Sequence, residues 1–299
     1  MKTKTVFLFL MLSSLYTLAQ SKISVAFIPI TYDSNTISGS DAVIIQESIL
    51  NSFVETKKFT VVDREKLSEI EKEKKLQRSE AFMDSDDVIT DGISKGASYL
   101  ISPSILGLRH TNTKKEWESM LQVQIKVLSV STGEILATAS VNSDFIKPDK
   151  IALDARSKYA SKKEISEMTN RQNRLQKEQK HKEDAFILAL ERLSDNVKIF
   201  TSKHFPLTID IANWDAKNKN ILTIAAGSNI GLIPGQLLDI MNITEVTIGD
   251  KTVQRRQKVA TACITKVDDA YFADAVILNS EKTFKKLRES NAFFKVITR

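Results

Sequence analysis

The spacing of apolar residues predicts a strand, a helix and a second strand at the start of the chain. Residues 23–30, ISVAFIPI, form a short apolar run that is typical of a strand buried on both faces. A polar stretch follows, in which Ser38 or Ser40 can cap a helix, and residues 59–62 are again β-forming. The helix between the two strands carries its apolar positions on one face: Ala42, Ile45, Ile49 and Phe53.

The second strand stops at Asp63, where the sequence changes to charged, helix-forming residues. Asp63 is a good N-cap because its side chain can accept a hydrogen bond from a free backbone N–H group of the first helical turn. Arg64 near a helix N-terminus opposes the helix dipole, which costs roughly 0.3–1 kcal/mol at an exposed site. We interpret Arg64 as a structural guanidinium that binds a neighbouring carboxylate or loop carbonyl, and a functional role is the alternative.

A third strand is predicted after Gly96, which ends a short helix. Its sequence, ASYLISPSILGL at residues 97–108, is apolar apart from the serines. Pro103 has no N–H group to donate to a sheet ladder, so we expect a sheet edge or a bulge at this point.

A β-hairpin follows the third strand. Residues 121–127 alternate between apolar and polar side chains, and Thr132 and Gly133 lie in the turn into the next strand, at 134–141. Together these elements predict an α/β sheet domain over residues 21–145, with flanking helices packed on at least one face.

The composition changes between residues 146 and 184, where charged residues dominate. Because no apolar seam persists for three heptads, we interpret this segment as a charged helical excursion or linker, with a partner-binding coiled coil as the alternative. A helix with a strong apolar face follows at residues 185–203, and we assign this helix to the α/β domain.

The last part of the chain, residues 206–299, is rich in short β-forming runs separated by turns. Gly231 and Gly235 lie in such turns, and Pro234-Gly235 suits a type II turn, whose third residue needs a positive φ. A run of short strands at near-regular spacing predicts a small all-β barrel. The predicted fold class is therefore an α/β (α+β) sheet domain followed by a β-barrel domain.

The N-terminus has the pattern of a secretory signal peptide over residues 1–20. Lys2 and Lys4 precede an apolar run that ends at Leu12, and small residues precede the expected cleavage site. No cysteine lies near that site to accept a lipid, so we expect an exported protein of the periplasm that is not a lipoprotein. The apolar run is shorter than the ~20 residues that span a bilayer, and no later run is closer to that length.

Charge and cysteine content narrow the classes of partner. The chain has 43 Lys and Arg residues and 37 Asp and Glu residues, a net charge of +6, which is only mildly basic. This balance, together with export, argues against a nucleic acid as partner. The single cysteine, Cys263, lies in an alternating strand, and we expect it to be buried rather than reactive.

No pattern of residues indicates catalysis, metal binding or cofactor binding. The three histidines stand apart, without cysteines or carboxylates at ligand spacing. The glycine-rich run GSNIGLIPG, residues 227–235, lacks the Gly-Lys-Ser/Thr ending and the following helix of a phosphate loop. A catalytic carboxylate pair is left open by the many acidic residues. We expect a protein that is not an enzyme and that has no catalytic, metal-binding or cofactor-binding residues.

The order of these motifs resembles a known family. The stretches FTVVDREKLSEIEKEKKLQ, GASYLISPSILGL and VQIKVLSVSTGEILATASV resemble the curli production assembly/transport component (CsgG-like) family, and they are also similar to the lipoprotein activator of penicillin-binding proteins. The matching positions are 59–67, 74–77, 96–101 and 125–141. The later stretch NIGLIPGQLLDIM resembles the small SH3-like barrel of flagellar assembly protein T.

The resemblance implies an envelope protein whose α/β domain binds proteins or oligomerises, followed by an SH3-like barrel. The curli channel inserts two long hairpins per subunit to form its pore, whereas the connection at residues 109–119 is short and polar here. We therefore expect the scaffold without the pore hairpins.

Three hypotheses for function follow. The first is a non-enzymatic accessory protein for the assembly or secretion of an envelope or extracellular structure. The second is a protein activator of a cell-wall (peptidoglycan) synthase. The third is an enzyme with a site at the end of the sheet. The expected partners are envelope or secreted proteins, and self-association and attachment to the outer membrane through a partner stay open.

Overall fold

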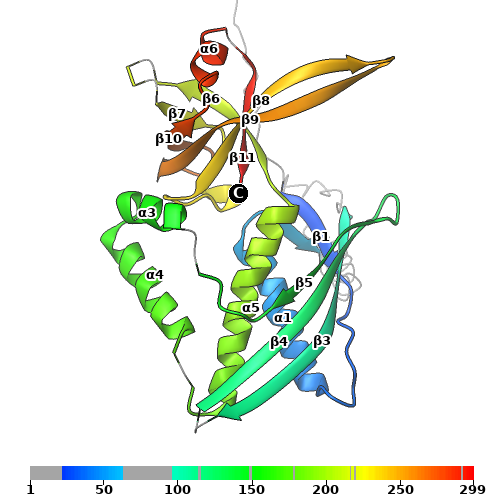
Figure 1. Ribbon diagram of the computed structural model, residues 1–299. Coiled ribbons are helices and arrows are strands. Elements are labelled where there is room, and N and C mark those ends of the chain that lie inside the picture. The colour runs from blue at the N-terminus through cyan, green and yellow to red at the C-terminus, as the bar shows by residue number, and fades with distance from the viewer. Residues whose placement is uncertain are drawn as a thin grey trace, which may run out of the picture.

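The computed structural model describes residues 22–62, 96–113, 116–147, 150–177, 179–215, 217–218, 220–290 and 292–299. These residues form a mixed α/β sheet domain and a small β-barrel stacked on one end of it (Figure 1). This architecture confirms the predicted fold class. The predicted signal peptide at 1–20 lies outside the described residues, as do Asp63 and Arg64.

The α/β domain is built on a five-stranded sheet in the order β2-β1-β3-β4-β5. β1 pairs in parallel with β2 and β3, whereas the β3–β4 and β4–β5 pairs are antiparallel. Helix α1 lies between β1 and β2 in the chain, because parallel neighbours need a long crossover connection. The strands are β1 (Ile23–Phe27), β2 (Phe59–Val62), β3 (Tyr99–Thr113), β4 (Glu116–Ser129) and β5 (Ile135–Asn142).

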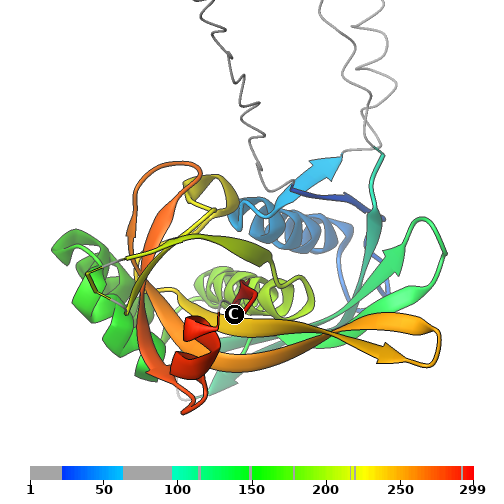
Figure 2. The same cartoon turned by 90° about the horizontal axis from the view of Figure 1, so that it is seen from above.

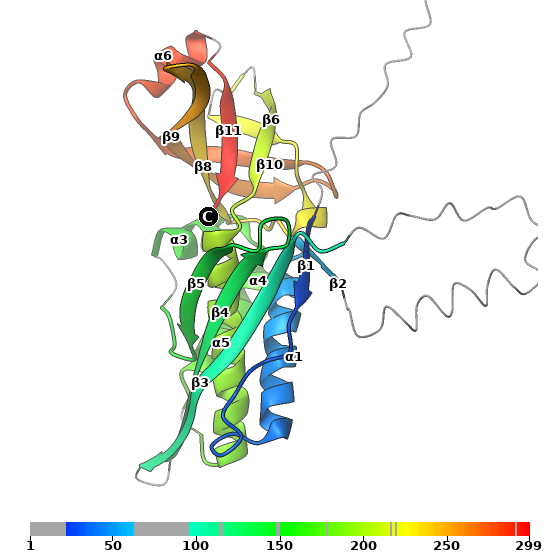
Figure 3. The same cartoon turned by 90° about the vertical axis from the view of Figure 1, so that its right-hand side faces the viewer.

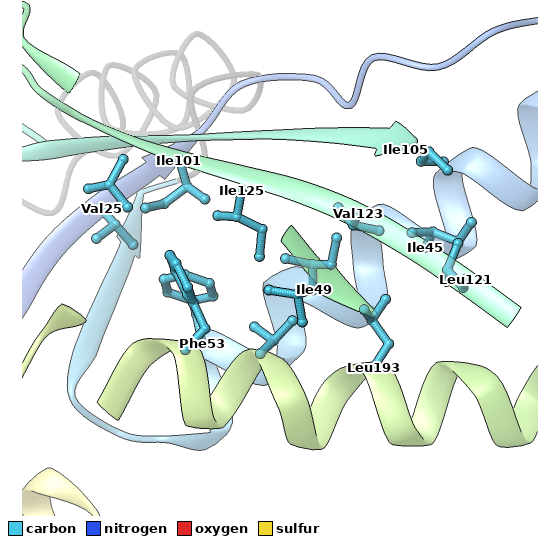
Figure 4. Close-up of a cluster of buried hydrophobic side chains, with 14 of the residues drawn as sticks. Val25, Ile45, Ile49, Phe53, Ile101, Ile105, Leu121, Val123, Ile125 and Leu193 are labelled. Carbon is cyan, nitrogen blue, oxygen red and sulfur yellow. The ribbon is translucent and has the colours of Figure 1, made fainter. Parts of the chain in front are cut away.

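Helices α1 (Gly39–Glu55) and α5 (Lys182–His204) pack side by side on one face of this sheet (Figure 3). Ser38 is the N-cap of α1, and its side chain accepts a hydrogen bond from the backbone N–H of Asp41 at 3.0 Å. The apolar face of α1 predicted from the sequence is the buried face. Figure 4 shows the shared core, formed by Val25, Ile45, Ile49, Phe53, Ile101, Ile105, Leu121, Val123, Ile125 and Leu193.

The β3–β4 hairpin is longer than the sequence pattern indicated. Residues 109–113 and 116–119, which we expected to form a short polar connection, continue both strands as a two-stranded ribbon. Most of these side chains are exposed or half-buried, so the ribbon needs no apolar face. The alternation used to predict strands is therefore weak here.

Pro103 lies in β3, which is a central strand and not a sheet edge. The expected bulge occurs two residues later, between Ile105 and Gly107. The carbonyl oxygen of Pro103 accepts a hydrogen bond from Thr31 N at 3.2 Å, beyond the end of β1. A strand residue directs its N and O atoms to the same side, so the missing N–H group faces this irregular segment and not the β4 ladder.

The C-terminal part closes into a six-stranded antiparallel barrel in the order β10-β7-β6-β11-β8-β9. Leu222, Ile224, Leu238, Ile240 and Val296 are among its core side chains, each at most 1% exposed. β8 and β9 continue past the barrel as an exposed ribbon that reaches out to one side (Figure 2). The strands are β6 (Thr208–Trp214), β7 (Ile221–Ile224), β8 (Leu237–Ile248), β9 (Lys251–Val267), β10 (Ala273–Ser280) and β11 (Phe294–Thr298), with the short helices η2 (Ser228–Ile230) and α6 (Phe284–Glu289).

The charged segment between β5 and α5 contains helices α3 (Lys150–Tyr159) and α4 (Lys162–Leu175). α3 packs on the outside of the barrel, where Ala155 and Tyr159 contact a small cluster that contains Leu237 and Cys263. Cys263 is fully buried, as the alternating strand predicted, and burial raises the pKa of its thiol to about 11. The thiol is therefore protonated at neutral pH and unsuited to nucleophilic chemistry.

Candidate functional site

A cleft of about 680 Å³ lies where the two domains meet. Helices α4 and α5 form one wall, and the segment 144–147 after β5 forms another. The start of β8 and the C-terminal Arg299 close the cleft on the barrel side. Its volume falls within the roughly 300–1,000 Å³ of typical ligand pockets. Because both domains line it, this interdomain cleft is the candidate functional site.

Gly235 determines how closely helix α3 approaches the barrel. Its φ is +81°, in a type II geometry closed by a hydrogen bond from Gln236 N to the carbonyl oxygen of Ile233 at 3.2 Å. A Cβ atom at this position would lie 2.4 Å from Cγ of Arg156 and 2.5 Å from its Cα. Glycine tolerates the positive φ and leaves room for Arg156. The side chain of Arg156 can therefore pass over the turn and line the cleft.

Positive charge dominates the cleft. Two aspartates, Asp144 and Asp195, line it. The basic residues that line it are Lys147, Arg156, Arg171, Arg192, Lys198, Lys203 and Arg299. This excess of cations produces a positive potential, which low-dielectric walls strengthen.

Some of these cations are neutralised locally. The ion pairs join Arg171 to Asp195 at 2.7 Å, Lys198 to Glu55 at 2.6 Å and Arg299 to Asp239 at 2.8 Å. Arg192 instead donates from Nε and Nη2 to the carbonyl oxygen of Leu175, at 2.9 and 2.6 Å. Lys147, Arg156 and Lys203 have no ion-pair partner among the residues that the structure describes.

Arg156 is the most desolvated of the three unpaired cations. Burial lowers the pKa of its guanidinium, which nevertheless stays protonated at neutral pH. Within the described part of the chain, its hydrogen-bond partner is the thioether of Met168, with Nη1 and Sδ 3.9 Å apart. A thioether is a weak acceptor, and a guanidinium has five N–H donors. Arg156 therefore has unused donors in the cleft.

A second desolvated cation lies behind the cleft wall. Lys58 is 5% exposed, and burial lowers the pKa of its ammonium group. Its Nζ atom donates to Oγ of Ser202 at 3.3 Å, and Ser202 itself lines the cleft. Lys58 adds to the positive potential without a carboxylate partner among the described residues.

Apolar side chains also line the cleft. Ile146 and Ile199 are each 50% exposed although they are large and apolar. The apolar residues that line the cleft are Phe145, Ile146, Met168, Leu175, Ile199 and Leu237. Cations beside an apolar wall can bind an anionic group that carries apolar neighbours, but they supply neither a nucleophile nor a general base.

Metal and membrane sites are not found in the described ranges. No group of three or more His, Cys, Asp or Glu side chains is placed there to hold a metal ion. Within the same ranges, no helix has both the length and the apolar character that crossing a membrane requires.

Of the motif residues predicted from the sequence, Gly231 also lies at the domain junction. Its φ is +75°, and a Cβ atom there would lie 2.3 Å from the carbonyl oxygen of Thr56, in the turn after α1. Gly231 and Gly235 are thus brought together in one barrel loop that faces the α/β domain. Only Gly235 of the two lines the cleft.

The other motif residues lie away from the cleft. Gly96 precedes β3, and its carbonyl oxygen accepts a hydrogen bond from Oγ of Ser24 at 3.2 Å. Thr132 and Gly133 lie in the turn between β4 and β5, where Gly133 has a φ of +72°. Asp63 and Arg64 fall outside the described residues, so their proposed roles stay predictions.

The sequence analysis missed Arg156 and the cleft. Arg156 lies in the charged segment that we interpreted as an excursion or linker, where one more arginine carries no signal. The spacing of Ala155 and Tyr159, one helical turn apart, is the pattern that could have identified a buried face on α3.

Comparison with known proteins favours the second of the two resemblances, the synthase activator, and with it the second of the three functional hypotheses. The family model of the peptidoglycan-synthase activator LpoB matches residues 35–141. This range runs from just before α1 to β5 and excludes the barrel. An activator of this kind is not itself an enzyme, so the match agrees with the prediction of a non-enzymatic protein. It also agrees with a place in the cell envelope and with an envelope protein as partner. No curated protein matches the sequence.

Solved structures resemble parts of the chain only distantly. The PelC dodecamer of Paraburkholderia phytofirmans is 18% identical, with a TM-score of 0.25, and the match covers 40% of this chain and 69% of that chain. A lipoprotein of Neisseria meningitidis is 10% identical, with a TM-score of 0.26, and the match covers 50% of this chain and 96% of that chain. Values this low carry no argument about function.

The LpoB match overturns the assignment to the curli production assembly/transport component family, together with its barrel counterpart in flagellar assembly protein T. Curli assembly and secretion are therefore no longer the preferred function. The motifs at 59–67, 74–77, 96–101 and 125–141 all lie within the matched range 35–141. The parts of these motifs that the structure describes, 59–62, 96–101 and 125–141, lie in strands and turns of the sheet. The motifs thus indicated the scaffold without separating one family from another.

Proposed function

We propose that the protein is a non-enzymatic, exported accessory protein that binds a peptidoglycan synthase on the periplasmic side of the cell envelope and raises its activity. The match of the LpoB family model to residues 35–141 is the observation that carries this proposal. The matched range includes α1, β3, β4 and β5, which form most of the α/β domain. We assign synthase binding to this part of the molecule.

The α/β domain is suited to such a role because its packed sheet offers a rigid surface to a partner. Buried side chains of α1, α5 and all five strands form one continuous core. The opposite face of β4 carries exposed or half-buried side chains, including Glu118, Met120, Gln122 and Lys126. A rigid, accessible surface lowers the entropic cost of binding.

The test is a synthase assay with purified components. The mature protein is added to each peptidoglycan synthase of the source cell, and the rate of glycan polymerisation and cross-linking is followed. We expect the rate of at least one synthase to rise in proportion to the bound fraction. Heat-denatured protein serves as the control. No change in rate with any synthase, although the protein is folded by circular dichroism, would refute the proposal.

A further inference from the structure

The side chains that line the interdomain cleft carry more positive than negative charge. Cations line it in excess, and Lys147, Arg156 and Lys203 have no ion-pair partner among the described residues. Lys147 and Lys203 are exposed, whereas Arg156 is partly buried. A desolvated cation without a counterion is costly, and an anion that pairs with Arg156 would offset part of that cost. The unmatched charge therefore indicates an anionic ligand.

We propose that the interdomain cleft binds an acidic, amphipathic segment of a partner protein, with a carboxylate on the guanidinium of Arg156. The planar fork of a guanidinium matches a carboxylate through two parallel hydrogen bonds. The weak contact to Met168 is the interaction that a carboxylate would replace most easily. Lys203 and Lys147, on other sides of the cleft, provide charge for a second acidic residue.

The apolar wall distinguishes an amphipathic segment from a small anion. Ile146 and Ile199 are half exposed and stand beside the cations, so an isolated phosphate or sulfate would leave them in water. A peptide that alternates acidic and apolar side chains covers both kinds of surface at once. The volume of about 680 Å³ accommodates several side chains.

Residues of both domains are needed to form the cleft. The barrel loop at Gly235 and the helix α3 hold Arg156 in place, whereas α5 supplies Lys203. Neither domain alone completes the site. The residues that line the cleft all lie outside the matched range 35–141, so this proposal does not depend on the family match or on the proposed activation of a synthase.

A direct binding assay tests the cleft. A fluorescein-labelled decapeptide of alternating Glu and Leu is titrated with the full mature protein, and anisotropy is measured at low and at physiological salt. A decapeptide with Gln in place of Glu has the same shape without the charge. We expect the Glu peptide to bind and the Gln peptide to bind at least about tenfold more weakly, because hydrogen bonds to charged groups are worth more than neutral ones.

Variants locate the site. Arg156→Gln is expected to weaken binding of the Glu peptide about tenfold or more, and Lys203→Gln, at an exposed position that folding does not depend on, by a smaller factor. Arg255→Gln on the exposed β9 ribbon removes the same charge away from the cleft, and should leave binding unchanged. Equal weakening by Arg255→Gln would overturn the proposal. So would unchanged binding in both cleft variants.

Two further outcomes would also overturn it. If inorganic phosphate at constant ionic strength displaces the peptide completely, the cleft is a site for a small anion. If the Glu and Gln peptides bind equally, charge does not select the ligand. Failure here is distinguishable from failure of the proposed function. If the Arg156→Gln variant activates a synthase as well as the unchanged protein does, activation does not require the cleft. If the protein binds the peptide but activates no synthase, the cleft proposal stands and the proposed function fails.

Discussion

At the scale of single residues, glycine is required for two different reasons, a positive φ and a lack of space for a side chain. Gly133, Gly231 and Gly235 all have positive φ, which L-residues adopt only with strain. At Gly133 a Cβ atom would meet nothing within 4 Å, so conformation alone selects glycine. At Gly231 and Gly235 the other domain or α3 also occupies the space of the missing side chain.

Substitution by alanine separates these two requirements. Gly133→Ala is expected to cost about 1–2 kcal/mol from backbone strain alone. Gly235→Ala should cost about 1–3 kcal/mol more, because Arg156 must move away from the new methyl group. Thermal unfolding followed by circular dichroism measures both. Equal melting temperatures for the two variants would mean that α3 yields without cost, and that Gly235 does not fix the position of Arg156.

At the scale of elements, α4 is the helix held mainly by polar contacts. Its capping box at Ser161 and Glu164 starts it, but Leu175 is its one buried residue among those described. α4 is fixed to α5 by two ion pairs, Arg171–Asp195 at 2.7 Å and Arg174–Glu191 at 3.0 Å, and by the hydrogen bonds of Arg192 to the carbonyl oxygen of Leu175. Exposed ion pairs contribute about 0–1 kcal/mol each.

Salt should therefore loosen α4 and leave the apolar helices unaffected. In 1 M NaCl the screening length falls to about 3 Å, and we expect amide hydrogen exchange in α4 to become several-fold faster. Exchange in α1, whose buried face includes Ile45, Ile49 and Phe53, should not change. Arg171→Gln should have the same effect at low salt, whereas Lys163→Gln, whose ion pair stays within α4, should not. Salt-independent exchange in α4 would contradict this account.

Elements also differ in how well sequence patterns predicted them. Strands and helices with one buried face, such as α1 and β4 up to Ser129, follow the expected periodicity closely. The ribbons at 109–113 with 116–119 and at 244–258 were not predicted, because most of their side chains meet water and no buried face imposes a pattern. Register and pairing in these ribbons come from the hydrogen-bond ladder continuing out of the sheet and the barrel.

At the scale of the whole molecule, α3 attaches the charged segment, which lies between β5 and α5 in the chain, to the barrel. Ala155 is 6% exposed against Leu237 and Cys263 of the barrel, while α5 belongs to the core of the α/β domain. Ile23 of β1 packs against both cores. The cleft exists because these contacts set the two domains at one angle and separation.

A charge introduced at this contact should detach α3 from the barrel. Ala155→Asp places an uncompensated carboxylate against an apolar cluster, and we expect a loss of about 3 kcal/mol or more in unfolding free energy. Ser157→Asp adds the same charge to the exposed side of the same helix and should change stability by no more than about 0.5 kcal/mol. Thermal denaturation of the two variants makes the comparison. Equal stability would show that the contact of Ala155 with the barrel does not hold α3 in place.

The sequence by itself determined the fold class, the buried face of α1 and the burial of Cys263, and it narrowed the cap of α1 to Ser38 or Ser40, of which the structure has Ser38. Each of these depends on periodicity or local backbone chemistry, which neighbouring residues encode. Only the tertiary structure decided that Gly235 and Arg156 meet, that α3 rests on the barrel and that several unpaired cations gather in one cleft. These residues come from segments far apart in the chain. The sequence pattern does not show whether a charged side chain is exposed to water or lies in a cleft, because that depends on the distances between elements, which no local pattern encodes.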